Sequence, residues 1–193
     1  MENRKEFTFP SADGRTAIHA VEWHPAGEPA GILQIAHGVA EYALRYEPFA
    51  RFLNAHGFLV VANDHLGHGE SVAEGAPRLY FGEKGSWQHV VDDMYTLRYR
   101  TGEAYPELPY FIMGHSMGSF LTRTYLIRYP GTVKGAILMG TGQNPDAMLV
   151  GARRSQAYWQ GRSGARTRAT SWKSSPSAPT TRPSRLTARA TTG

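Results

Sequence analysis

One pentapeptide carries residue types that could do covalent chemistry: Gly114-His115-Ser116-Met117-Gly118, with the spacing G-x-S-x-G. It follows the apolar stretch YFIM and precedes a segment with helical spacing, so the serine is expected on a sharp strand-to-helix turn. The flanking glycines remove side chains that would collide there, and the helix would present its N-terminus beneath the hydroxyl. Ser116 is therefore predicted to be an acyl-transfer nucleophile. The alternative is a serine that only caps the helix.

A second segment could supply the groups that stabilise an oxyanion. The apolar run at residues 31–36 is typical of a buried strand and ends at His37-Gly38. Acyl transfer needs two backbone N–H donors aimed at the tetrahedral oxyanion. One comes from the residue after the nucleophile, here Met117, and the other from the turn after an earlier strand, for which Val39 is predicted. The alternative is that His37-Gly38 simply ends a strand.

The elements that must position these residues alternate between strand and helix patterns. Strands are predicted at residues 6–9, 15–24, 31–36, 58–62, 110–113 and 133–139. Helices are predicted at residues 46–56, 86–105 and 117–129, with Gly57 as a C-terminal cap and Ser86 as an N-terminal cap. The first two strands would form a hairpin. The alternation that follows predicts an α/β fold, a mostly parallel sheet with helices on both faces.

Four segments in this order and spacing resemble the α/β-hydrolase superfamily. They are residues 37–41 (HGVAE), Arg45-Tyr46, residues 64–71 (DHLGHGES) and residues 114–118 (GHSMG). Within the superfamily they are most similar to the bacterial lysophospholipase and monoacylglycerol-lipase-like group, the serine aminopeptidase-type hydrolases. The resemblance covers about residues 5–150 and none of the remaining chain.

The resemblance implies a Ser–Asp–His triad with Ser116 as nucleophile, an oxyanion hole at Val39 and Met117, no cofactor, and a helical cap over the site. It implies hydrolysis of a carboxylic ester, such as a monoacylglycerol or a lysophospholipid-like lipid. A peptidase of the same fold uses the same machinery, and a non-catalytic binder could retain the fold, so both alternatives stay open. Around the nucleophile the motifs place five supporting residues: His37, Gly38, Gly114, His115 and Gly118.

The chain departs from that pattern after Ser116. In this fold the triad acid and base follow the nucleophile along the chain, yet the only later carboxylate is Asp146 and no histidine follows His115. Asp146 comes just after the strand at 133–139, where the cap rather than the triad acid is expected. The pattern supplies about six of the eight strands that the resemblance implies. The chain is therefore predicted to be a truncated, largely inactive hydrolase.

The other histidines have simpler interpretations. His115 adjoins the nucleophile, but neighbours on the turn cannot both face the same proton, so it is assigned a packing or structural role. His37 is expected to order the oxyanion turn. His65 and His68, beside Asp64, have an H-x-x-H spacing, but they lie in a Gly-rich loop with no third ligand nearby, so no metal is predicted. Four more are expected at the surface or at edges: His19, His24, His56 and His89.

Charge divides the chain into two parts. Residues 1–150 contain all 16 acidic residues and 12 of the 21 lysines and arginines, a net charge of −4, whereas residues 151–193 carry +9. Of the last 43 residues, 36 are Arg, Ser, Thr, Ala, Gly or Pro. The prediction is a hydrolase core at 1–150, followed by a basic low-complexity segment. That segment is a disordered arm, a tail that folds on a partner, or an out-of-frame translation of GC-rich DNA. The abrupt boundary favours the last.

Composition excludes several classes of protein. The chain has no cysteine, which excludes disulfide scaffolds, thiolate zinc sites and cysteine nucleophiles. No apolar run reaches the roughly 18 residues of a membrane-spanning helix, and the first residues lack the apolar core of a secretory signal, so a cytoplasmic protein is expected. Because the basicity belongs to the last segment alone, no nucleic acid partner is expected. The expected partner is a small acyl ester or lipid, with peripheral lipid contact left open.

Overall fold

A computed structural model describes residues 3–83 and 85–142 of the chain. The strands in these ranges are β1 (Arg4–Pro10), β2 (Ala17–Trp23), β3 (Gly31–Ala36), β4 (Phe58–Asn63), β5 (Tyr110–His115) and β6 (Gly135–Met139). The helices are η1 (Ala43–Tyr46, a 3-10 helix), α1 (Glu47–Ala55), α2 (Trp87–Ala104) and α3 (Met117–Arg128). No helix in these ranges is long and apolar enough to cross a membrane. One unit spans residues 1–143, and a second spans 144–193, outside the described residues.

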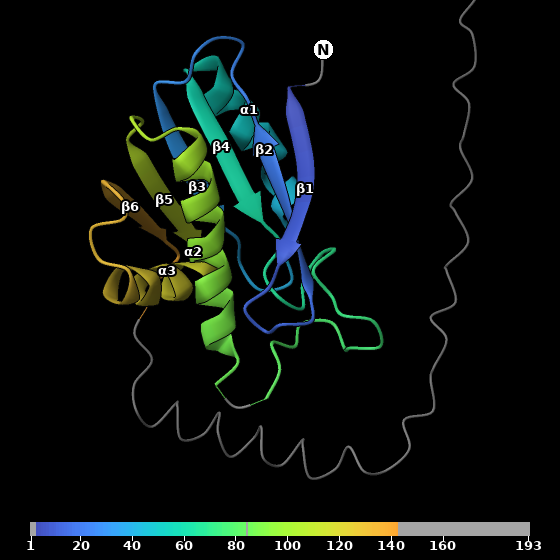
Figure 1. The fold of residues 1–193 in the computed structure, drawn as a ribbon. Helices are drawn as coiled ribbons and strands as arrows, with labels where there is room; N and C mark the ends of the chain where they lie inside the picture. Colours follow the sequence, from blue (N-terminus) through green and yellow to red (C-terminus); the bar gives the residue numbers. More distant parts are fainter. Residues whose placement is uncertain (1–2, 84, 143–193) are drawn as a thin grey trace, which may run out of the picture. The chain divides into compact units, whose positions relative to one another are not determined.

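The strands form one mixed sheet in the order β1-β2-β4-β3-β5-β6 (Figure 1). β1 and β2 form an antiparallel hairpin and β2 pairs antiparallel with β4, whereas β4, β3, β5 and β6 run parallel. β4 lies on one side of β3 and β5 lies on the other, so the chain crosses from one side of β3 to the other between β4 and β5. The carboxyl end of β3 is therefore a switch point, the place where open α/β sheets bind ligands. The predicted fold class, including the N-terminal hairpin, is confirmed.

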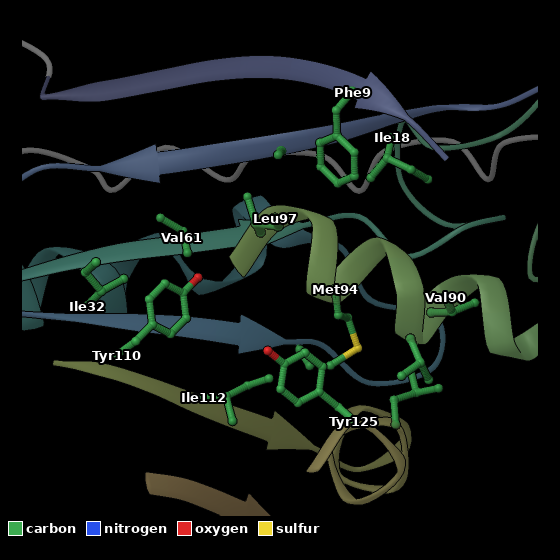
Figure 2. Packing of buried hydrophobic residues seen from close by; sticks show 14 of the residues in the cluster. Phe9, Ile18, Ile32, Val61, Val90, Met94, Leu97, Tyr110, Ile112 and Tyr125 are labelled. Carbon is green, nitrogen blue, oxygen red and sulfur yellow. The ribbon is translucent and has the colours of Figure 1, made fainter. Parts of the chain in front are cut away.

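Side chains of the central strands alternate between two apolar clusters, one on each face of the sheet. Ile32 of β3 belongs to the cluster that α2 and α3 cover, whereas Leu33 and Ile35 belong to the cluster beside α1. Figure 2 shows the first cluster, in which α2 lies over side chains of the sheet. Its helix residues include Val90, Met94, Leu97 and Tyr125. Helices thus cover both faces, as the alternation of strand and helix patterns predicts.

Two predicted helix caps have different outcomes. Gly57 follows α1 with φ +82°, a left-handed conformation that glycine adopts readily. Ser86 precedes α2, but its backbone is helical, with φ −63° and ψ −16°, and its side chain makes no capping hydrogen bond. A capping serine needs an extended backbone, whereas the N–H of Ser86 already bonds the carbonyl of Glu83 in a turn. The capping role predicted for Ser86 is therefore wrong.

β6 is the outermost strand of the sheet and is poorly covered. It pairs with β5 on one side, and no strand of the described residues pairs with its other side. Ile137 is 53% exposed and Met139 47%, whereas every residue of β3 is buried. The sheet therefore has a buried centre and an apolar, uncovered edge.

Candidate active site

Ser116 lies on the turn between β5 and α3, with φ 51° and ψ −117°. A positive φ is unfavourable for a residue with a Cβ, so the surroundings must hold it. The N–H of Ser116 donates to the carbonyl of Met139 on β6 at 2.9 Å. Its carbonyl accepts from the N–H of Ser119 at 2.9 Å and from the Ser119 hydroxyl at 2.6 Å. These bonds fix the sharp strand-to-helix turn that the G-x-S-x-G spacing predicts.

The two glycines of the motif permit close approach of the backbone. A Cβ on Gly114 would collide with the carbonyl of Gly118 and the hydroxyl of Thr122. A Cβ on Gly118 would collide with the carbonyl oxygens of Ala36 and His37. The start of α3 therefore lies directly against the end of β3, and only glycine fits at this contact.

The loop after β3 lies beside the Ser116 turn. Ala36 pairs with Gly114 in parallel register, which places the loop that contains Val39 at the same edge as the turn. Val39 is 55% exposed, and its N–H has no hydrogen-bond partner among residues 3–83 and 85–142. Met117 is the first residue of α3, where N–H groups have no intrahelical acceptor. Both predicted oxyanion donors are therefore free to bind an incoming group.

His37 is fully buried at the base of this loop, and both of its ring nitrogens are engaged. Its Nε2 accepts from the N–H of His65 at 2.9 Å, so its Nδ1 carries the proton and donates to the carbonyl of Gly38 at 2.8 Å. Burial lowers the pKa of His37 to about 4, so the ring is neutral at pH 7. With no free lone pair, His37 cannot take a proton from Ser116, and its bonds hold the two loops together.

His65 and His68 pack against His37 as neutral rings. Ring centroids lie 4.1 Å apart for His37–His65 and 5.4 Å apart for His37–His68. Burial lowers the pKa of both His65 and His68. The described part of the chain contains no group of three or more His, Cys, Asp or Glu arranged to hold a metal. His68 also packs against Phe81, with ring centroids 5.6 Å apart.

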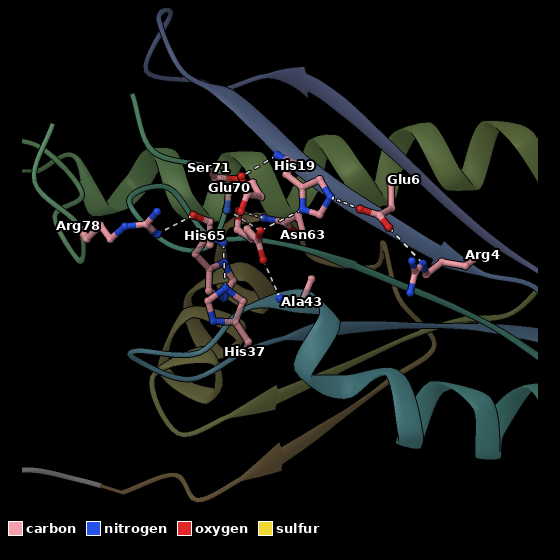
Figure 3. A network of polar contacts seen from close by, with 12 residues as sticks. Arg4, Glu6, His19, His37, Ala43, Asn63, His65, Glu70, Ser71 and Arg78 are labelled. Carbon is pink, nitrogen blue, oxygen red and sulfur yellow. Dashed lines mark hydrogen bonds and ion pairs between the residues drawn. The ribbon is translucent and has the colours of Figure 1, made fainter. Parts of the chain in front are cut away.

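Asp64 organises the Gly-rich loop through three hydrogen bonds. Its carboxylate accepts from the N–H of Ala43 at 2.6 Å, from the N–H of Glu70 at 2.9 Å, and from His19 Nδ1 at 3.0 Å. Burial opposes ionisation of Asp64, but these bonds outweigh it and lower its pKa. Figure 3 shows the network, in which His19 also reaches Glu6 of β1.

The surface role expected for His19 is wrong. This side chain is only 10% exposed and lies between Asp64 and Glu6, with 3.0 Å to each carboxylate. The hydrogen bond to Asp64 raises the pKa of His19 despite burial. Alternation along β2 carries no sign of this pairing, because it depends on a residue 45 positions away.

Glu41 and Tyr46 form a second cluster at the site, which the sequence motifs include without indicating a role. Glu41 Oε2 accepts from the N–H of Gly38 at 2.8 Å and from the Tyr46 hydroxyl at 2.8 Å. His115 Nδ1 lies 3.3 Å from the same oxygen and 3.2 Å from the Tyr46 hydroxyl. The available signal was a carboxylate three residues after Gly38. His115 is thus held by polar contacts beside Ser116.

No imidazole of the described residues is hydrogen-bonded to Ser116. Asp146, the only carboxylate after the nucleophile, lies outside the described residues, as does the whole predicted segment 151–193. The described site therefore holds a strained serine and two free amides without a positioned proton acceptor.

Comparisons with known proteins identify the family of the chain. A profile of the family described as serine aminopeptidase, S33, matches residues 27–190. This range extends into the basic segment, so the expectation that the resemblance covers none of the chain after residue 150 is wrong. The chain is 36% identical to the monoacylglycerol lipase of Mycolicibacterium smegmatis over 141 residues, which are 73% of this chain and 48% of the relative. It is 35% identical to the human monoglyceride lipase over 134 residues, which are 67% of this chain and 40% of the relative.

Solved structures give the same assignment of fold. A thermostable carboxyl esterase from Bacillus coagulans superposes with a TM-score of 0.72 at 34% identity, covering 84% of this chain and 52% of the esterase. A lipase in an open form has a TM-score of 0.64 at 32% identity, covering 69% of this chain and 43% of the lipase. The chain thus spans about half the length of these relatives.

Proposed function

Because this chain belongs to the serine aminopeptidase (S33) family of α/β-hydrolases, we propose that Ser116 is the nucleophile of acyl-ester hydrolysis and that the Val39 and Met117 amides form its oxyanion hole. The observation that carries the proposal is the backbone of Ser116, with φ 51° on a turn between a strand and a helix. Strain of this kind persists where the surroundings impose it, and it gathers at catalytic positions.

The geometry supports the following reaction. The Ser116 oxygen bonds to the acyl carbon while the carbonyl electrons move to the oxygen, which the two amides stabilise. Collapse of this intermediate expels the alcohol, which takes up a proton, and water then releases the fatty acid from the acyl-serine. The serine proton needs an acceptor, and none is placed among the described residues. We therefore propose that this chain supplies the nucleophile and the oxyanion hole, with very slow turnover.

The proposed substrate is a monoacylglycerol or a lysophospholipid-like lipid. The relatives at 35–36% identity are lipases of monoacylglycerols by name, and a similar structure is a carboxyl esterase. The family description favours one second candidate, a peptidase that uses the same serine. The proposal requires no cofactor and no nucleic acid.

A fluorophosphonate probe tests the nucleophile without needing turnover, because it reacts with an accessible, oriented serine. We expect slow labelling of the 193-residue chain, located at Ser116 by peptide mass spectrometry, and no labelling of Ser116→Ala. Ser119→Ala is the matched control, because it removes a nearby hydroxyl that bonds the turn rather than reacting. Labelling at another serine, or none at high probe concentration, would leave a non-catalytic binder as the better interpretation.

Competition distinguishes the two substrate classes. Monoolein should slow fluorophosphonate labelling of Ser116 more than an aminoacyl p-nitroanilide at the same concentration. The opposite order would favour the peptidase.

A further inference from the structure

One carboxylate oxygen joins the two segments that form the proposed oxyanion hole. Glu41 Oε2 accepts from the N–H of Gly38, the residue before Val39, at 2.8 Å. The same oxygen lies 3.3 Å from Nδ1 of His115, the residue before Ser116. This one carboxylate oxygen therefore contacts both the loop after β3 and the turn after β5.

The charge of Glu41 is set by this environment. Its side chain is only 13% exposed, and burial opposes ionisation. The bonds from the Gly38 amide, the Tyr46 hydroxyl and His115 outweigh burial and lower the pKa of Glu41, so the carboxylate is ionised at pH 7. Hydrogen bonds to an ionised acceptor are shorter and roughly twice as strong as neutral ones.

Gly38 lies close to both side chains of this cluster. A Cβ on Gly38 would lie 2.9 Å from Glu41 Oε2 and 3.3 Å from His115 Nδ1. Gly38 has an ordinary negative φ, so the glycine is needed for this close approach rather than for a left-handed turn. The carboxylate and the imidazole thus pack directly on the backbone beside Val39.

A surface ion pair does not account for this cluster. Arg45 Nε lies 3.4 Å from Glu41 Oε1, but the arginine is 63% exposed and belongs to an i,i+4 pair, an interaction that contributes little. The contacts to Gly38, Tyr46 and His115 all use Oε2, the oxygen that faces the site.

We infer that Glu41 is a positioning residue, which holds the Val39 amide at the separation from Ser116 and Met117 that a tetrahedral oxyanion requires. The role of Glu41 in catalysis rests on the proposed function, in which Ser116 is the nucleophile. Glu41 does not contact the reacting atoms. It acts through Gly38 on one segment and through His115 on the other.

The test compares an analogue of the tetrahedral intermediate with a neutral ligand of the same length. Octylboronic acid bonds to the Ser116 oxygen through boron, and the serine proton leaves to solvent, so the adduct is a tetrahedral anion. 1-Octanol occupies the acyl region without forming that anion. In the full chain, Glu41→Gln should weaken boronic acid binding by about tenfold, since it replaces charged hydrogen bonds by neutral ones, and should leave octanol binding unchanged.

Controls separate positioning from general loss of structure. Glu103→Gln removes an exposed carboxylate of α2 with the same change in charge, and should change neither affinity. Tyr46→Phe removes one hydroxyl that bonds Glu41 without touching the Gly38 contact, and should give a smaller selective loss. If Glu41→Gln fails to fold, the selective loss in Tyr46→Phe decides. Equal losses for both ligands, or no loss for the boronic acid, would overturn the inference.

Amide hydrogen exchange tests the positioning role of Glu41 independently of the proposed hydrolase function. If the wild-type chain forms no boronic acid adduct, the proposed hydrolase function fails. Glu41→Gln should still speed amide exchange in both residues 37–42 and residues 114–118, and Glu103→Gln should not. Unchanged exchange in either segment would show that Glu41 does not join them.

Discussion

The two sides of Ser116 differ sharply in how they are built. Toward β3, His37 is fully buried with both ring nitrogens bonded, and Gly118 lies against the backbone of Ala36 and His37. Toward β6, Ser116 has one hydrogen bond, to Met139, and that strand presents apolar side chains that are about half exposed. We call these the closed side and the open side of the site.

The difference teaches that the two functions of a hydrolytic site come from different parts of the sequence. Residues 36–41 and 114–118 are enough to orient the serine and to expose two amides. In this fold the proton acceptor and its orienting acid follow the nucleophile along the chain. Under the proposed function, the groups that would stabilise the oxyanion are therefore in place without a proton acceptor among the described residues.

The largest predicted effect follows from the missing proton acceptor. A serine hydroxyl is a weak nucleophile near pH 7 without a base, and loss of triad members lowers turnover by about 10⁴ to 10⁶. Hydrolysis of p-nitrophenyl butyrate by the 193-residue chain should therefore be indistinguishable from that by Ser116→Ala. A chain whose corrected reading frame after codon 150 supplies an Asp and a His should be active in a Ser116-dependent way.

Two results would count against this prediction. Robust turnover by the 193-residue chain that disappears in Ser116→Ala would mean that another group takes the proton. His68→Gln would then be the first variant to examine, because its buried Nε2 has no partner among the described residues. If sequencing of the source DNA shows the existing frame to be correct, the out-of-frame interpretation of residues 151–193 is wrong.

The closed side should not tolerate one additional methyl group. In Gly118→Ala the new Cβ would collide with carbonyl oxygens of Ala36 and His37, and such overpacking should lower the free energy of unfolding by about 3 kcal/mol. Gly27→Ala is the matched control, because a Cβ there meets nothing within 4 Å and the φ is not positive. Urea unfolding at low protein concentration measures both. Equal stability of the two variants would contradict the close packing of α3 on β3.

A charged residue on the open side should be tolerated and should reduce association of the chain. An apolar strand edge templates association, so the 193-residue chain is predicted to be poorly soluble or partly molten. Ile137→Lys should raise the fraction of monomer in sedimentation and change stability by less than about 0.5 kcal/mol. Ile127→Lys makes the same change at an 82% exposed position of α3 and should help less. A monodisperse wild-type monomer with a sharp cooperative melt would contradict this prediction.

The fold was predictable because its signals are local. Apolar runs such as residues 31–36 and 58–62 become β3 and β4 almost unchanged, and alternation with helical spacing indicates the parallel connections. The cap at Ser86 was wrong for a local reason as well. Gly85, the residue before Ser86, has φ +93°, and the backbone of Ser86 itself is helical. A preference based on residue type alone does not take this backbone conformation into account.

The site was predictable only in part, because some of its contacts join distant segments. The turn at Ser116 is predictable from its two flanking glycines, although the contact that requires Gly118 is with the distant residues Ala36 and His37. The pairing of His19 with Asp64 and of Glu41 with His115 joins residues 45 and 74 positions apart. No periodicity encodes these partners, and only the register of β3 against β5 brings the second pair together.

A pH-dependent effect is predicted for the ion pair that joins His19 of β2 to Asp64 in the loop after β4. The pKa of His19 is raised above its unfolded value of about 6.5. Its contribution to stability is therefore complete below about pH 6.5 and is lost as pH rises through the folded pKa. His19→Gln should lower the free energy of unfolding by about 1.5 kcal/mol at pH 6, and the difference from wild type should shrink toward pH 8.5.

His37→Asn provides a control of opposite sign. The pKa of His37 is lowered to about 4, so the contribution of His37 to stability is complete above about pH 6.5 and is lost on acidification. Urea titrations from pH 4.5 to 8.5 would measure both differences, and a His19→Gln difference that grew with pH would show that the imidazole is not held as a cation by Asp64.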